Sequence, residues 1–129
     1  MTQRHPFIIL GAAGAFFSVA FGAFGAHSMK TLMSPELQVT FETAVRYQMY
    51  HSLALLVLGV LVMRARHRNL IVAGWLFAWG IVLFSGSLYL LSMTSATWLG
   101  IVTPMGGTLF LAGWVFLAVG DLKGRLASP

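Results

Sequence analysis

The sequence predicts an all-α membrane protein, a four-transmembrane-helix bundle that runs up, down, up and down, with the N- and C-termini cytoplasmic. Of its 129 residues, 58% are hydrophobic and only 9% are charged, whereas a soluble domain carries about 25% charged residues. Four apolar runs are each long enough to cross a bilayer, which takes about 20 residues. The runs cover 7–26, 45–63, 70–91 and 99–119, and we expect one integral membrane domain over residues 1–129.

The first run contains no charged residue. A cleaved signal peptide is the alternative, because Arg4 precedes the run and Ala23-Phe24-Gly25 is compatible with a cleavage site. The apolar part of a signal peptide usually covers about 7–15 residues. This run is longer, so we favour a helix that stays in the membrane.

The second run is expected to belong to a helix that begins before the membrane. Ser34 suits the N-cap, Pro35 the first helical position and Glu36 the first turn. A helix from Pro35 to the end of the run would be about 43 Å long, which exceeds a hydrocarbon core of about 30 Å. Its first turns therefore project outward or lie in the interface.

The third and fourth runs are both uncharged. Thr103 and Pro104 leave two interpretations of the fourth. Thr103 could cap a helix that begins at Pro104, with the residues before it as an interfacial approach. Alternatively, Pro104 with Gly106 and Gly107 could kink a longer helix, and broken membrane helices often mark transporter sites. We favour the cap.

Basic residues set the expected orientation. With four spans, the termini and the 64–69 connection share one side of the membrane. That side carries Arg4, Arg64, Arg66, Arg68, Lys123 and Arg125, and the other carries Lys30 and Arg46. Because Lys and Arg are retained in the cytoplasm, both termini should be cytoplasmic. The same distribution argues against nucleic acid as a partner, since the charges form no single patch.

Small residues recur every seven positions in two spans and predict close helix packing. The first span has Gly11, Ser18 and Gly25, and the fourth has Gly106, Gly113 and Gly120. We expect the first and fourth spans to pack on each other through these rows. The alternative is that the glycines are scattered because the composition is rich in glycine.

Polar side chains gather at one expected depth, near the outward ends of the spans. The buried polar cluster that we expect here comprises His27, Glu42, Arg46, Tyr47, Gln48, His51, Ser85, Ser87, Tyr89 and Thr103. Glu42 and Arg46 stand four residues apart in the order that favours an ion pair on a helix. Polar groups facing lipid would cost a few kcal/mol each, so we expect the cluster to bond between helices or to lie in the headgroup layer.

Four segments resemble the signature segments of the domain of unknown function 423 family, and they occur in the family's order. They are GAFGAH (22–27), FETAVRYQMYH (41–51), LFSGSLYLL (83–91) and TPMGG (103–107). That family includes bacterial inner-membrane proteins and the animal transmembrane protein 256. The resemblance implies a small multi-pass protein of the bacterial inner (plasma) membrane, and it implies no catalytic residue, ligand or substrate.

Four classes of function fit these observations unequally. We favour a structural or interaction subunit in which the polar cluster joins helices, with membrane lipids, further copies or another membrane protein as partners. An oligomer that conducts protons or small solutes is the alternative, followed by a protein that binds lipid, quinone or haem, the last through His27 and His51. We expect no cofactor, no metal site and no enzyme, because three acidic residues offer little for paired-carboxylate chemistry and no known catalytic motif occurs.

Overall fold

A computed structural model describes residues 5–126, and every regular element in that range is a helix. The principal helices are α1 (Pro6–His27), α2 (Pro35–Arg64), α3 (Arg68–Gly80), α4 (Gly86–Thr94) and α5 (Val102–Leu126). Short helical segments lie at Met29–Thr31 (η1), Ile81–Ser85 (η2) and Thr97–Ile101 (η3). The prediction of an all-helical protein is confirmed.

Four helical stretches are long and apolar enough to cross a membrane, as predicted. They are Pro6–His27, Pro35–Arg64, Arg68–Thr94 and Thr97–Gly124. Each begins earlier and ends later than the apolar run from which it was predicted. The most apolar part of the second and third spans is 44% and 39% buried inside the protein, against 17% for the first and fourth. The second and third spans therefore form the centre, and the other two lie at the edges.

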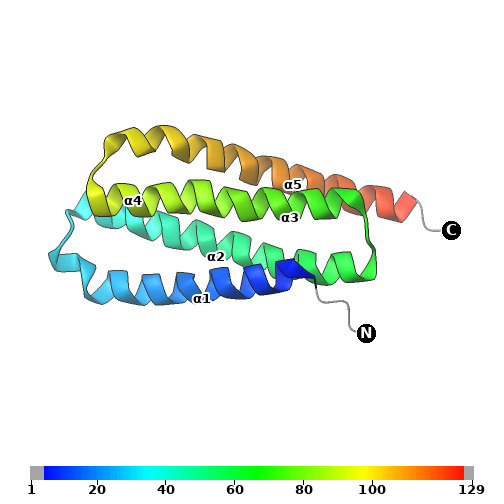
Figure 1. Cartoon of the computed structure of the whole chain (residues 1–129), viewed down its shortest axis with the longest axis horizontal. Coiled ribbons are helices and arrows are strands. Elements are labelled where there is room, and N and C mark those ends of the chain that lie inside the picture. The colour runs from blue at the N-terminus through cyan, green and yellow to red at the C-terminus, as the bar shows by residue number, and fades with distance from the viewer. Residues whose placement is uncertain (1–4, 127–129) are drawn as a thin grey trace.

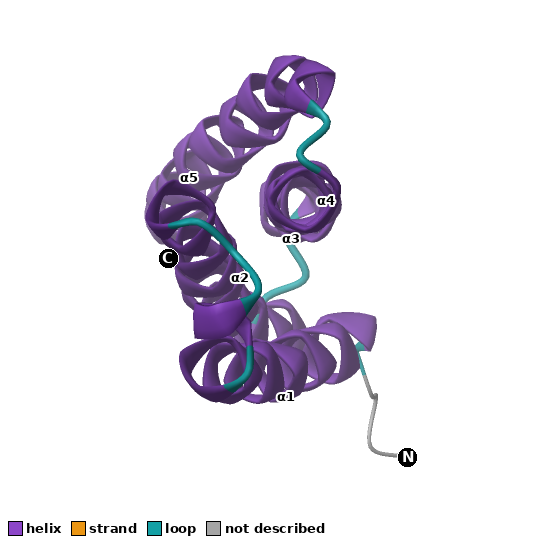
Figure 2. Ribbon diagram, turned by 90° about the vertical axis from the view of Figure 1, so that its left-hand side faces the viewer, coloured by secondary structure: helices purple, strands orange, loops and turns teal. Residues whose placement is uncertain are grey.

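The spans alternate in direction, so that the connections gather at two ends (Figure 1). We call the end where α1 begins, α5 ends and the 65–67 connection lies the terminal end, and the end with the 28–34 connection the distal end. In both views α1 lies at one edge and α5 at the other, with α2 and the α3–α4 span between them (Figures 1 and 2). The most extensive helix contacts are those of α1 with α2 and of α3 with α5.

The expected packing of the first span on the fourth is therefore wrong within the described residues. Both small-residue rows are contact faces, but the row in α1 packs on α2 and the row in α5 packs on the third span. In α1, a Cβ added at Gly11 would lie 2.7 Å from the carbonyl oxygen of Ser52 in α2, and Gly25 lies under the ring of Phe41. In α5, Gly106 lies directly against the backbone of Phe84. Small residues thus mark a close approach without naming the partner helix.

Two predicted helix starts have different outcomes. The start of α2 is confirmed, since Ser34 accepts a hydrogen bond from the Leu37 N–H at 3.3 Å and Pro35 is the first helical residue. The cap predicted at Thr103 is wrong, because α5 begins at Val102 and Thr103 lies inside it. The Thr103 hydroxyl instead bonds the Leu99 carbonyl, in the 3₁₀ turn that leads into α5.

The third span contains a π-helical segment that the sequence did not predict. Residues of η2 continue α3 directly into α4 without a break, between Gly80 and Gly86. Such single turns occur often at functional positions. The apolar core lies on the terminal side of this segment and includes Phe7, Leu58 and Phe77, each fully buried.

Candidate functional site

Gln48 joins three of the four spans. It lies on α2 and is 5% exposed. Its side-chain amide donates to the Gly14 carbonyl of α1 at 2.8 Å, and its amide oxygen accepts from the Tyr89 hydroxyl of α4 at 2.7 Å. The Tyr89 ring also packs against Phe21 and Phe41, with ring centroids 5.2 Å apart in both cases. The side chain thus ties α1, α2 and α4 together at one level.

Two buried serines bind consecutive carbonyls of α2 from opposite sides. Ser18 of α1 donates to the Val45 carbonyl at 2.7 Å, and Ser85 of η2 donates to the Ala44 carbonyl at 2.8 Å. Both serines are 1% exposed. A carbonyl oxygen has two lone pairs, so it can accept such a bond in addition to its helical one. Both bonds are of the kind that joins helices where water is absent.

A third contact joins α4 to α5 beside the π-helical segment. The hydroxyls of Ser87 and Thr103 lie 2.8 Å apart, and either can be the donor. Ser87 also bonds the carbonyl of Phe84, which is the residue against which Gly106 packs. This pair joins α4 to α5 near the place where Gly106 packs against the backbone of Phe84.

His51 is buried and forms a hydrogen bond at each ring nitrogen. Nδ1 lies 2.8 Å from the Tyr47 carbonyl, and Nε2 lies 3.1 Å from the indole nitrogen of Trp114. Because an indole can only donate, Nε2 must accept, so the arrangement suits a neutral imidazole with its hydrogen on Nδ1. The ring stacks on Phe110 at a centroid distance of 3.5 Å. With both nitrogens used, His51 offers none to a haem iron.

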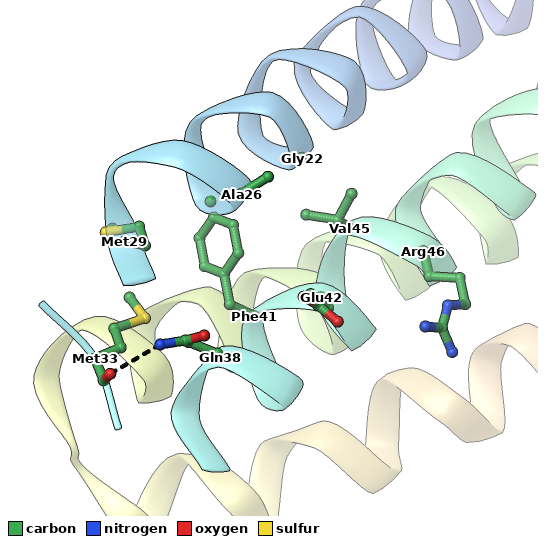
Figure 3. A pocket seen from close by; sticks show the side chains of 10 residues that line it. Gly22, Ala26, Met29, Met33, Gln38, Phe41, Glu42, Val45 and Arg46 are labelled. Atoms are coloured by element: carbon green, nitrogen blue, oxygen red, sulfur yellow. Dashed lines mark hydrogen bonds between the residues drawn. The ribbon is translucent and has the colours of Figure 1, made fainter. Parts of the chain in front are cut away.

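Three residues of the predicted cluster lie outside these contacts. His27, Glu42 and Arg46 are exposed, and no hydrogen bond joins Glu42 to Arg46 (Figure 3). Tyr47 is 39% exposed and packs its ring against Phe84. The depth of these residues was inferred from the sequence, but their direction around the helix was not. Tyr47, Gln48, His51, Ser85, Ser87, Tyr89 and Thr103 do bond or pack between helices.

Glu42 and Arg46 instead line a groove beside the contact of α1 with α2, which we call the distal groove (Figure 3). Its volume is about 310 Å³. Phe41 lies in its floor, against Gly25. Gln38 closes one end by donating to the Met33 carbonyl at 3.0 Å.

The sequence interpretation missed three members of the contact set. Trp114 was not among the predicted residues, because no local signal connects it to a histidine 63 positions away. Ser52 is fully buried, and its hydroxyl has no partner; it occupies the place that a Cβ of Gly14 would take. Gly14 could have been found, because it lies between Gly11 and Ser18 at the spacing of one helix face.

Comparisons with known proteins agree on one family. A family model described as "Protein of unknown function (DUF423)" matches residues 21–107. A UPF0382 membrane protein of Staphylococcus epidermidis is 49% identical over 117 residues, covering 91% of this chain and 95% of its own. UPF0382 membrane protein YwdK of Bacillus subtilis is 43% identical over 91% of this chain and 96% of its own. A UPF0382 membrane protein of Haemophilus influenzae is 37% identical, over 95% of this chain and 98% of its own. No solved structure matches.

Proposed function

The chain belongs to the DUF423 family of membrane proteins, and from this premise we propose that it is a structural or interaction subunit of the bacterial inner membrane. It would have no enzymatic activity, and both termini would lie in the cytoplasm. Its polar side chains would join the spans rather than conduct or react. Its partners would be membrane lipids together with another copy or another membrane protein.

The observation that supports a structural role is that the buried polar groups are already bonded within the chain. Among the described residues, the Ser52 hydroxyl is the one buried side-chain polar atom without a partner. A proton relay or a solute site needs groups that are free to exchange partners. The hydrogen-bond partners of Gln48, His51 and Ser85 are instead fixed, because they belong to other spans.

The terminal half of the protein also argues against conduction through one chain. Its buried core is built from apolar side chains, including Leu55, Leu58 and Phe77, and the buried polar residues of the described chain lie on the distal side of these three. A polar path from the distal end would stop there. The three acidic residues, Glu36, Glu42 and Asp121, are all exposed, which supports the absence of buried carboxylate chemistry.

The test compares stability with ion flux in the same variants. His51→Leu should lower the thermal stability of the purified protein, because it leaves the Trp114 N–H without an acceptor. Thr108→Val is the matched control, since its exposed hydroxyl bonds only within its own helix. Proton flux into liposomes should equal that of empty liposomes for all three proteins. Wild-type flux that His51→Leu abolishes without loss of stability would replace this proposal with a transport function.

Orientation has its own test. A reporter that is active only in the cytoplasm, fused after Pro129, should be active. Activity from an exported reporter alone would reverse the proposed layout.

Self-association can be measured by the fluorescence transfer between labelled copies as the lipid-to-protein ratio rises. Transfer that falls to the level of random mixing would leave other membrane proteins or lipids as the partners.

A further inference from the structure

A second groove, at the terminal end, is lined by one arginine, one histidine and apolar side chains, with no acidic residue in its described lining. We call it the terminal groove, and its volume is about 510 Å³. The start of α1, the end of α2 and the first turns of α3 form its walls. The residues that line it are His5, Pro6, Val62, Met63, Arg66, Ile71 and Trp75.

The terminal groove is amphipathic. His5 and Arg66 supply its polar part, and the rest of its wall is aliphatic or aromatic. Trp75 is 45% exposed, and its ring meets the buried Phe7 edge-on at 5.5 Å. Indole rings favour the level of lipid headgroups, where one side is apolar and the other is wet. A ligand with an anionic head and an apolar tail would match both parts of this groove.

The His5 ring is prepared to donate a hydrogen bond. Its Nδ1 accepts from the Phe7 N–H at 3.5 Å as the cap of α1, so the hydrogen of the neutral ring is on Nε2. Burial lowers the pKa of His5, and the charge of the nearby Arg66 lowers it further. The two side chains are thus close enough to repel when both are charged, and an anion between them would remove that repulsion.

We propose that the terminal groove binds an anionic phospholipid, with the phosphate between His5 and Arg66 and an acyl chain against the apolar wall. Basic pockets between spans are suited to acidic headgroups, and arginine binds phosphate through two parallel hydrogen bonds. The distal groove differs in charge, because Glu42 lines it together with Arg46. In the described lining, a basic residue without an acidic one is therefore found in the terminal groove and not in the distal groove.

The test measures lipid retention by native mass spectrometry of the full chain in neutral detergent. Phosphatidylglycerol and phosphatidylcholine with the same acyl chains compete for the protein. The wild type should retain phosphatidylglycerol, and Arg66→Gln should reduce that retention by about five-fold, the change that corresponds to ~1 kcal/mol per basic residue near an acidic lipid surface. Its melting temperature should stay unchanged, because Arg66 is exposed.

Two controls separate a built site from general attraction. Arg68→Gln removes an exposed arginine at the same end that does not line the terminal groove, and Arg46→Gln removes one from the distal groove. Both should retain phosphatidylglycerol as the wild type does. An equal loss in Arg68→Gln, or no preference for phosphatidylglycerol in the wild type, would overturn the proposal. Displacement of the lipid by millimolar glycerol phosphate would also overturn it, since a soluble anion would then suffice.

The pH dependence of phosphatidylglycerol retention gives a second, independent test. Among residues 5–126, Arg66 is the charged group that acts on His5, and the α2 and α3 residues that line the groove are uncharged. A bound phosphate favours the protonated ring, so retention should rise as pH falls through the pKa of His5, which lies below its ordinary value. His5→Asn keeps a capping side chain and should make retention independent of pH. A flat profile in the wild type would contradict the role given to His5.

Discussion

In the terminal half of the bundle the helices meet through aromatic and aliphatic side chains, whereas in the distal half they meet largely through hydrogen bonds. The terminal half contains the apolar core, with Phe7, Leu55 and Phe77 almost fully buried. The distal half contains Gln48 and Ser85, which bond the backbone or side chains of other spans. His51 lies between the two, bonded like the distal set and stacked on the core residue Phe110.

The two halves therefore contribute differently to the protein in lipid. Burying apolar surface gives little advantage there, because acyl chains are as apolar as the core, so close packing has to stabilise the terminal half. Hydrogen bonds between membrane helices average only about 0.6 kcal/mol each. They fix which atoms meet, and so the distal half specifies the register of the spans more than it adds stability.

The largest expected effect is in the terminal half. Phe77→Ala should lower the free energy of unfolding by about 3 kcal/mol, since it empties a fully buried site against Gly113 and Trp114. Chemical unfolding in mixed micelles measures this. Phe16→Ala is the matched control, because Phe16 is 68% exposed and its loss should have little effect. Similar losses in both variants would show that the core does not depend on packing.

The next effect tests whether packing also matters in the distal half. Gly106→Ala should lower the free energy of unfolding by about 2 kcal/mol, because the added methyl meets the backbone of Phe84, which cannot move like a side chain. Gly100→Ala is the control, since nothing lies within 4 Å of its added Cβ. A Gly106 variant as stable as the wild type would confine tight packing to the terminal half.

A smaller effect is expected for the hydrogen bonds of Gln48. Tyr89→Phe removes one bond and should cost about 0.6 kcal/mol. Gln48→Leu should cost more, because it also leaves the Gly14 carbonyl without this donor. In a double-mutant cycle, adding Tyr89→Phe to Gln48→Leu should change little. Fully additive losses would show that the Gln48–Tyr89 bond is absent in the membrane.

The smallest effect is expected in the distal groove. Glu42→Gln combined with Arg46→Gln should leave the melting temperature within about 1 °C of the wild type, because both side chains are exposed and unbonded to each other. Differential scanning fluorimetry is sensitive enough for this comparison. A drop of several degrees would place the pair among the stabilising contacts of the distal half.

Spans, connections and the start of α2 could be predicted from the sequence, because apolar length and capping residues are local signals. The pairs of helices in contact could not be predicted, because a small-residue row such as Gly106 and Gly113 indicates a close contact without showing which helix makes it. The depth of Gln48 and Tyr89 was predictable from the topology. Their direction was not, which is also why His27 and Glu42 were expected in a buried cluster.

The π-helical segment is one reason why the direction of side chains around the third span could not be predicted. A π turn places one extra residue in the helix, and one residue rotates all that follow by about 100°. Tyr89 and Ser87 come after η2, so a regular helical wheel drawn from Leu70 misplaces both. Nothing in the residues Ile81–Ser85 marks this winding in the sequence.

The pairing of α1 with α2 and of α3 with α5 makes the molecule two helical hairpins that meet along α2 and the third span. Each hairpin keeps its most extensive contacts to itself, and one short exposed stretch, residues 65–66, links the pair. We therefore expect that the first hairpin can enter the bilayer before the second is synthesised. Two separate polypeptides, divided at that stretch and produced in one cell, should find each other and rebuild the native protein.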